Sequence, residues 1–184
     1  MKKINFNELS KIISHALRHQ PSLYNLELDK DGWVDLGLLM SSIKEIDKKY
    51  STLSIEDVKS MIASSSKKRH EMCNNKIRAS YGHSIKDKIL KKPVKPPKYL
   101  YHGTKEEMII NIFDKGLLPM QRQYVHLSEN KEDAIIVALR KTSKPILLKI
   151  ESGKAYEQGV IFYKEAGGLW LSDKIDSKYL KRIN

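Results

Sequence analysis

One proline-rich stretch divides this chain, and it constrains the fold more than any other feature of the sequence. Residues 91–98 place three prolines among lysines. Proline has no backbone N–H and cannot continue a helix or a central strand. We therefore predict two lobes, residues 1–90 and residues 99–184, joined by an exposed linker at residues 91–98.

The composition favours folded lobes, and the net charge favours binding to a polyanion. Of 184 residues, 40% are hydrophobic, which is enough for packed cores. The formal net charge is +12, and a globular chain this basic often binds nucleic acid or an anionic membrane. A merely soluble basic protein from a lysine-rich proteome is the plainer alternative, so the charge alone favours nucleic acid only modestly.

The sequence gives no sign of secretion or membrane insertion. Cys73 is the only cysteine, so no internal disulfide can form. The first residues lack the apolar run of a signal peptide, and no stretch approaches the 18 apolar residues that a membrane span requires. We expect a cytoplasmic protein that works as a monomer.

Three segments of the first lobe repeat apolar residues at the spacing of an amphipathic helix. They begin after Asn5, Asp35 and Ser54, which are residue types that cap helices. Asn5 and Ser54 each precede an acidic residue by three positions, as in a capping box. We expect Pro21 to end the first helix.

A hairpin is predicted after these helices, from short runs at residues 69–72 and 77–80 around Asn74 and Asn75. Three helices followed by a hairpin is the order of a winged helix. We therefore predict a winged-helix lobe that serves as an RNA- or phosphate-binding platform, an inference made by analogy with that fold.

The second lobe alternates strands and helices, so we predict a compact mixed α/β lobe and an α+β chain overall. Helix starts are expected at Thr104 and Ser128, and Gly116 is expected to close the first of these helices. The chain contains no dinucleotide-binding glycine motif and no Walker A motif. The predicted strands cover residues 99–102, 124–127, 145–150, 160–163 and 169–171.

Two basic clusters of the first lobe are candidate phosphate ligands. Arg18 and His19 stand at the end of the first predicted helix, where arginine offers a planar donor fork and histidine can transfer a proton. The helix dipole favours basic residues there in any protein. The second cluster follows the third helix and extends over both hairpin arms, and it is either an RNA-backbone patch or a solvated charge run. It comprises Lys67, Lys68, Arg69, His70, Lys76 and Arg78.

Two stretches of the second lobe share a pattern in which a strand ends in histidine and a small hydroxyl residue opens a helix. Such strand ends beside helix N-termini suit the phosphates and ribose of a nucleotide. A metal site is less favoured, because no acidic or cysteine partner stands at ligand spacing. The stretches are Tyr101-His102-Gly103-Thr104 and Val125-His126-Leu127-Ser128, and Gly82-His83-Ser84 forms a third cluster in the first lobe.

Taken together, these clusters resemble the RNA 2′-phosphotransferase, or KptA, family. The matching motifs occur in the same order as in the family and extend over nearly the whole chain. Each motif is weak evidence alone, but the set together is specific. The matching stretches lie at residues 9–19, 26–35, 67–69, 77–79, 82–84, 100–104, 116–117, 122, 125–128, 140 and 168–171.

The resemblance implies a winged-helix lobe, an ADP-ribosyltransferase-like lobe and a reaction in two steps. The 2′-phosphate of RNA attacks the nicotinamide ribose of NAD⁺, which is consumed as a co-substrate, and nicotinamide leaves. A ribose hydroxyl then attacks the phosphorus, which releases RNA with a 2′-hydroxyl and ADP-ribose 1″,2″-cyclic phosphate. The substrate is a 2′-phosphorylated, tRNA-like RNA, as in tRNA splicing, and no metal is required.

The resemblance also implies roles for individual residues. The catalytic set of the family falls on Arg18, His19, Arg69 and Arg122. The arginines would clamp the phosphate, and His19 would orient it and assist proton transfer. The residues implied to hold NAD⁺ are Tyr101, His102, Gly103, Thr104, His126, Leu127, Ser128, Gly82, His83, Ser84 and Arg140, while Lys68 and Arg78 are implied to contact RNA or phosphate.

Some positions depart from the family pattern, and two other functions stay open. His70 stands where the family usually has phenylalanine, Lys76 replaces a common arginine, and Ala138 stands where glycine is frequent. The first alternative function is an ADP-ribosyltransferase that caps terminal phosphates of nucleic acid. The second is a winged-helix nucleic-acid-binding protein without catalytic activity.

Overall fold

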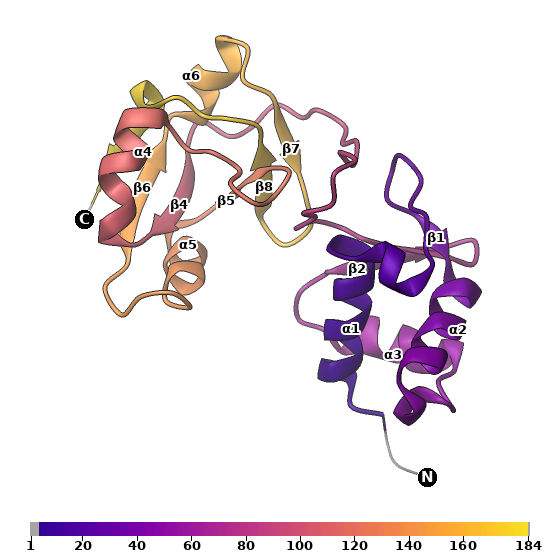
Figure 1. Ribbon diagram of the computed structural model, residues 1–184. Coiled ribbons are helices and arrows are strands. Elements are labelled where there is room, and N and C mark those ends of the chain that lie inside the picture. Colours follow the sequence, from indigo (N-terminus) through magenta and orange to yellow (C-terminus); the bar gives the residue numbers. More distant parts are fainter. Residues whose placement is uncertain (1–3, 184) are drawn as a thin grey trace. The chain divides into compact units, whose positions relative to one another are not determined.

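A computed structural model describes residues 4–183 of the chain. It divides into two compact units, one that ends at Leu90 and one that begins at Lys91 (Figure 1). Helices and a small sheet form the first unit, and a six-stranded sheet dominates the second. Each unit has its own hydrophobic core. The predicted α+β class is confirmed.

Three helices form the body of the first unit: α1 (Phe6–Arg18), α2 (Leu36–Ile46) and α3 (Ile55–Ser64). The predicted caps are confirmed, since the side chains of Asn5, Asp35 and Ser54 accept backbone N–H groups of the first turns. Ser54 and Asp57 complete a capping box. The 3₁₀ turns η1 (Pro21–Tyr24) and η2 (Lys48–Tyr50) connect the helices.

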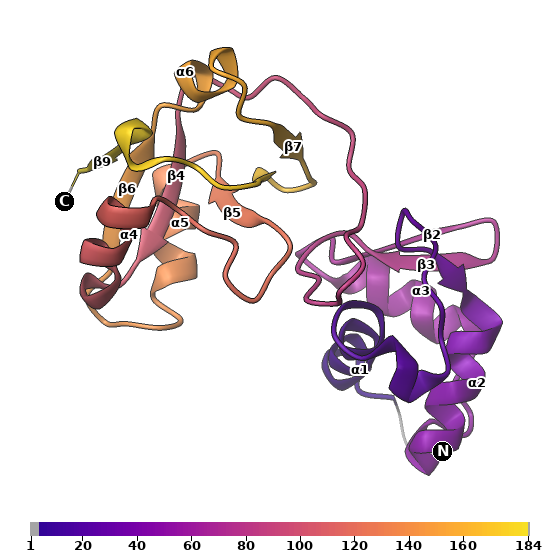
Figure 2. The same ribbon diagram turned by 45° about the horizontal axis from the view of Figure 1, so that its top comes forward.

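The predicted hairpin consists of β2 (His70–Cys73) and β3 (Lys76–Ala79). Asn74 and Asn75 make its turn with φ of 45° and 59°, a left-handed conformation that asparagine tolerates better than most residues. A third strand, β1 (Val34–Asp35), pairs antiparallel with β3 and was not predicted, because two residues carry no readable alternation. The hairpin lies over one end of the three helices (Figure 2).

The second unit is an antiparallel sheet in the order β7-β8-β5-β4-β6-β9. Strand β5 alternates buried and half-buried residues, whereas β6 and β8 are buried at all positions but one, so the core lies along the sheet. The predicted strand at residues 145–150 is an interior strand, paired with β4 and β9. The strands are β4 (Leu100–Thr104), β5 (Val125–Ser128), β6 (Ile146–Ile150), β7 (Phe162–Lys164), β8 (Leu169–Ser172) and β9 (Leu180–Arg182).

Three helices accompany this sheet: α4 (Ile109–Lys115), α5 (Lys131–Ala138) and α6 (Ser152–Glu157). Gly116 ends α4 as predicted, with φ of 81°. Two predicted helix starts are wrong. Thr104 is the last residue of β4 and precedes the 3₁₀ turn η3 (Glu106–Met108), and Asn130 rather than Ser128 caps α5. A further 3₁₀ turn, η4 (Ser177–Tyr179), precedes β9.

The proline-rich segment 91–98, predicted as an exposed linker, is only partly exposed because it packs onto the second unit. The backbone N–H of Val94 donates to the carbonyl of Phe162. The hydroxyl of Ser152 donates to the carbonyl of Pro97 at 2.7 Å. Lys91 and Glu165 form an ion pair at 2.7 Å, with both side chains only 10% exposed.

Candidate active site

A groove of about 520 Å³ runs along one face of α1 in the first unit. Two of the residues implied to be catalytic, Arg18 and His19, stand at its end, because Arg18 is the last residue of α1 and His19 is the C-cap. Arg69 enters the groove from the segment before β2. The side chains that line this groove, called the α1 groove below, belong to Asn7, Ser10, Lys11, Ser14, His15, Arg18, His19 and Arg69.

The two arginines of the α1 groove are held by their neighbours. Arg18 donates through Nη2 to the carbonyl of Arg69 at 3.2 Å. Arg69 donates through Nη1 to the hydroxyl of Ser65 at 3.1 Å. These bonds tie the end of α1 to the segment that links α3 and the hairpin. The fold thus brings Arg18 and His19 together with Arg69, which follows Arg18 by 51 residues in the sequence.

The segment that follows the hairpin, residues 80–84, folds back onto the end of α1. The backbone N–H of Ser84 donates to the carbonyl of Arg18 at 2.9 Å. The hydroxyl of Ser84 lies 2.8 Å from Nδ1 of His19, and the Arg18 guanidinium lies 5.1 Å from the ring centre of Tyr81. Gly82 permits this path with φ of +86°, a conformation in which other residues are strained.

Beneath the α1 groove, His70 joins the hairpin to α1. Its Nε2 lies 3.0 Å from the hydroxyl of Ser14, and its side chain is buried. Burial, together with the positive charges of Arg18 and Arg69, lowers the pKa of His70 to about 3. His70 is therefore neutral near pH 7, and it adds no charge beneath the arginines.

In the second unit, His102 on β4 and His126 on β5 are fixed by backbone carbonyls. Nδ1 of His102 donates to the carbonyl of His126 at 2.9 Å, and Nδ1 of His126 donates to the carbonyl of Tyr124 at 3.0 Å. Burial lowers the pKa of His102, and the charges of Lys141 and Arg122 act in the same direction. His102 is thus neutral with its proton on Nδ1, so its Nε2 is a hydrogen-bond acceptor.

The remaining residues expected to hold NAD⁺ in the second unit lie on or near the same strands. Gly103 allows α5 to pack against β4, since a Cβ there would meet the carbonyl oxygen of Ala134. The side chain of Leu127 is buried in the core, so only its backbone is available to a ligand. Tyr101, Thr104 and Ser128 are half-buried, and Tyr101 on β4 pairs with Ser128 on β5. Arg140 is exposed just after α5.

Other predicted residues of the first unit lie outside the α1 groove. His83 is buried and its ring lies close to Gly32. Arg78 forms two hydrogen bonds with Oε2 of Glu71, at 2.8 and 3.1 Å, and lies 4.5 Å above the ring of Trp33. Lys68 is exposed.

Among the residues not singled out in the sequence, Ser14 lines the α1 groove, whereas Ser65 and Tyr81 support it by contacting Arg69 and Arg18. Ser14 stands one helical turn before Arg18, so helical spacing alone would have placed it on the same face. Ser65 and Tyr81 carry no such signal, because both lie in irregular segments.

Within residues 4–183, no three histidine, cysteine or acidic side chains come close enough to hold a metal ion. None of the helices described is long and apolar enough to cross a membrane.

The described residues that line the α1 groove include two arginines and a lysine and no carboxylate. A groove of this charge is typical of proteins that bind phosphorylated ligands.

Comparison with known proteins specifies this class further. Residues 5–174 match the model of the family described as RNA 2′-phosphotransferase, Tpt1 / KptA family. A probable RNA 2′-phosphotransferase of Acetivibrio thermocellus is 46% identical over 98% of this chain and 99% of its own length. One from Bacillus thuringiensis is 47% identical over 95% of this chain and 94% of its own. Another, from Archaeoglobus fulgidus, is 37% identical over 99% of this chain and 83% of its own.

The chain belongs to the Tpt1 / KptA family of RNA 2′-phosphotransferases. Its activity is that of a transferase that acts on the 2′-phosphate of RNA.

Proposed function

We propose that this enzyme removes an internal 2′-phosphate from RNA by transferring it to NAD⁺, in the course of tRNA processing. The products are RNA with a 2′-hydroxyl, nicotinamide and ADP-ribose 1″,2″-cyclic phosphate. The observation that carries the proposal is the convergence of Arg18, His19 and Arg69 in one groove that no described acidic residue lines. Family membership supports the reaction class.

Arg18 and Arg69 act in this proposal as the clamp on the RNA 2′-phosphate. Each guanidinium carries five N–H donors in a rigid plane that matches a phosphate. The contacts of Arg18 to the Arg69 carbonyl and of Arg69 to Ser65 set the direction of these planes before RNA arrives. Donors held in place stabilise the charge that builds on phosphoryl oxygens at no cost in reorganisation.

His19 orients the phosphate and assists proton transfer, and Ser84 orients His19. The hydroxyl of Ser84 lies 2.8 Å from Nδ1, so it fixes the plane of the imidazole. The backbone bond from Ser84 to Arg18 ties the same loop to the neighbouring clamp residue. The role of Ser84 toward His19 rests on these contacts, and its predicted role toward NAD⁺ remains a separate proposal, shared with Gly82 and His83.

The second unit holds NAD⁺, which supplies an electron-poor ribose carbon whose bond to nicotinamide breaks readily. The residues present fit such a group, because Nε2 of the neutral His102 can accept a hydrogen bond from a ribose hydroxyl. Arg122 lies in the same unit as His102, and its positive charge lowers the pKa of that histidine. We assign the remaining contacts to Tyr101, Gly103, Thr104, His126, Leu127, Ser128 and Arg140, with Lys68 and Arg78 toward RNA.

One assay tests the proposal through two of its three products. The protein is incubated with NAD⁺ and an oligonucleotide that carries one internal 2′-phosphate, and RNA and nicotinamide are quantified. We expect equal amounts of 2′-hydroxyl RNA and nicotinamide. An ADP-ribosylated oligonucleotide that accumulates without 2′-hydroxyl RNA would instead support a capping enzyme. Bound RNA with no nicotinamide released would support a binding protein without catalytic activity.

A further inference from the structure

The α1 groove is longer than one phosphate group requires. Arg18, His19 and Arg69 occupy one end, and the groove continues past Ser14 and Ser10 to Lys11 and Asn7. Lys11 stands seven residues before Arg18 on α1, which places it on the same face two turns away, about 10 Å along the axis. A second anionic group can therefore lie in the same groove as the 2′-phosphate.

The charge of Lys11 is not used by the fold. Its side chain is exposed, and its ammonium group makes no ion pair or hydrogen bond with the described part of the chain. The nearest carboxylate on α1 belongs to Glu8, which pairs with Lys49 at 3.2 Å instead. The far end of the α1 groove thus keeps a positive charge available for a ligand.

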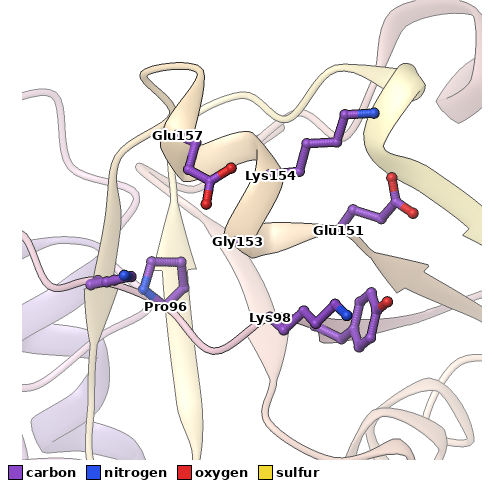
Figure 3. Close-up of a pocket in the computed structure, with 8 residues that line it drawn as sticks. Pro96, Lys98, Glu151, Gly153, Lys154 and Glu157 are labelled. Atoms are coloured by element: carbon purple, nitrogen blue, oxygen red, sulfur yellow. The ribbon is translucent and has the colours of Figure 1, made fainter.

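A second pocket of the molecule provides a contrast. It has a volume of about 470 Å³ and lies in the second unit. Lys98 and Lys154 line it together with the carboxylates of Glu151 and Glu157 (Figure 3), and Lys95 is a third lysine of its lining. The two carboxylates offset most of the charge of its three lysines, whereas no carboxylate offsets the two arginines and the lysine in the described lining of the α1 groove. The distribution of charge therefore selects the α1 groove for the RNA strand.

We propose that Lys11, with the polar side chains of Ser10 and Asn7 beside it, binds a backbone phosphate of the RNA next to the 2′-phosphorylated nucleotide. This subsite rests on the proposed function, and it specifies how the enzyme engages the RNA chain beyond the reacting group. Phosphate contacts of this kind set the register of a strand without reading its sequence. Lys11 thus selects an internal 2′-phosphate, which is flanked by backbone phosphates, over the 2′-phosphate of a free nucleoside.

The test compares two fluorescent oligonucleotides of one sequence, with and without a single internal 2′-phosphate, by anisotropy. The Lys11→Ala variant should bind both about fivefold more weakly, since both keep the backbone phosphate. The slope of log affinity against log salt should fall by about 0.7 for the lost single-strand contact. Arg69→Ala should weaken only the oligonucleotide with the 2′-phosphate. Lys48→Ala, which removes the same charge from an exposed site outside the groove, should change neither.

Turnover gives a second readout. For a 2′-phosphorylated trinucleotide, Lys11→Ala should raise KM and leave kcat unchanged, and for a nucleoside 2′-phosphate it should change neither. Equal binding of both oligonucleotides by Lys11→Ala and the wild type would overturn the subsite, as would a loss confined to the 2′-phosphorylated one. If the wild-type protein cannot distinguish the two oligonucleotides, the proposed function fails, whatever Lys11→Ala does.

Discussion

At the scale of single residues, the clamp depends on the shape of arginine as well as on its charge. Arg69 donates one N–H to the hydroxyl of Ser65, and its backbone carbonyl accepts a hydrogen bond from Arg18. The plane of the Arg69 guanidinium is therefore fixed within the α1 groove. A lysine in its place would keep the charge and lose the planar fork. We expect Arg69→Lys to lower the single-turnover rate of 2′-phosphate transfer by about 10²-fold. Lys67→Arg, at a position outside the groove lining, is the matched control, and a rate above half that of the wild type for Arg69→Lys would contradict the clamp.

Ser84 tests the orientation of His19. Removal of its hydroxyl in Ser84→Ala should lower kcat by about fivefold to tenfold, the equivalent of one hydrogen bond. It should also displace the pH profile of kcat, because the neighbour of Nδ1 is lost. Ser84→Thr keeps the hydroxyl and should restore both. Ser66→Ala, at an exposed position, is the control. A lower rate with an unchanged pH profile, not rescued by threonine, would leave Ser84 with a structural role only.

Among single residues, the sequence was informative where a residue type is tied to a regular element. Arg18 and His19 at a helix end, and Arg69 before a strand, were singled out, and the structure brings them into one groove. Tyr81 and Ser65 could not be found in this way, because their partners depend on the path of irregular segments. The contact between Ser84 and His19 was not predicted either, since only the fold of residues 80–84 creates it.

At the scale of elements, His70 connects the hairpin to α1 through Ser14, and its burial beside Arg18 and Arg69 makes the stability of the first unit depend on pH. The pKa of His70 lies near 3 in the folded state and near 6.5 when unfolded. Between these values only the unfolded chain binds the proton. The free energy of unfolding therefore falls as the pH falls through this window, by about 1.4 kcal/mol per pH unit at most.

The His70→Phe variant removes this titration. Between pH 6.5 and 5, the wild type should lose about 2 kcal/mol more of its unfolding free energy than the variant does. Urea denaturation followed by far-UV circular dichroism, which reports mainly the helices, measures the difference. An equal loss of unfolding free energy in the wild type and the variant would show that His70 takes up its proton in the folded state as well.

The packing of α5 on β4 depends on Gly103. A Cβ at this position would clash with the carbonyl oxygen of Ala134 and lie 2.8 Å from the Cβ of Ala138. Backbone atoms cannot move aside as a flexible side chain can, so Gly103→Ala should destabilise the second unit by about 1–3 kcal/mol. Urea denaturation monitored through the buried Trp170 tests this. An unchanged urea midpoint would mean that α5 accommodates the added methyl group without loss of stability.

Elements whose ends are marked by strong local signals were predicted well, and those that depend on pairing were not. Asn5, Asp35 and Ser54 cap their helices as expected. Thr104 and Ser128 have the same local pattern, but each is the final residue of a paired strand, opposite Ile146 and Leu169 respectively. Strand pairing decided their conformation. Helix α6 and strand β9 are six and three residues long, too short for a periodic pattern.

At the scale of the whole molecule, the family match extends over residues 5–174 and so covers parts of both compact units. We propose that the first unit is a winged helix that receives RNA and that the second is an ADP-ribosyltransferase-like fold that receives NAD⁺. The prediction at this scale is that His102→Ala raises KM for NAD⁺ while leaving the anisotropy affinity for 2′-phosphorylated RNA unchanged. A matching loss of RNA affinity would refute this division of labour.

The most direct test of the account asks where the 2′-phosphate binds. Nitrogen-15 NMR can follow the Nε–Hε signals of Arg18 and Arg69, assigned with the variants Arg18→Lys and Arg69→Lys. The protein is titrated, without NAD⁺, with an oligonucleotide that carries one internal 2′-phosphate and with the same oligonucleotide lacking it. We expect both arginine signals to shift strongly with the first oligonucleotide and weakly with the second. Identical responses to the two, or shifts confined to residues outside the α1 groove, would contradict it.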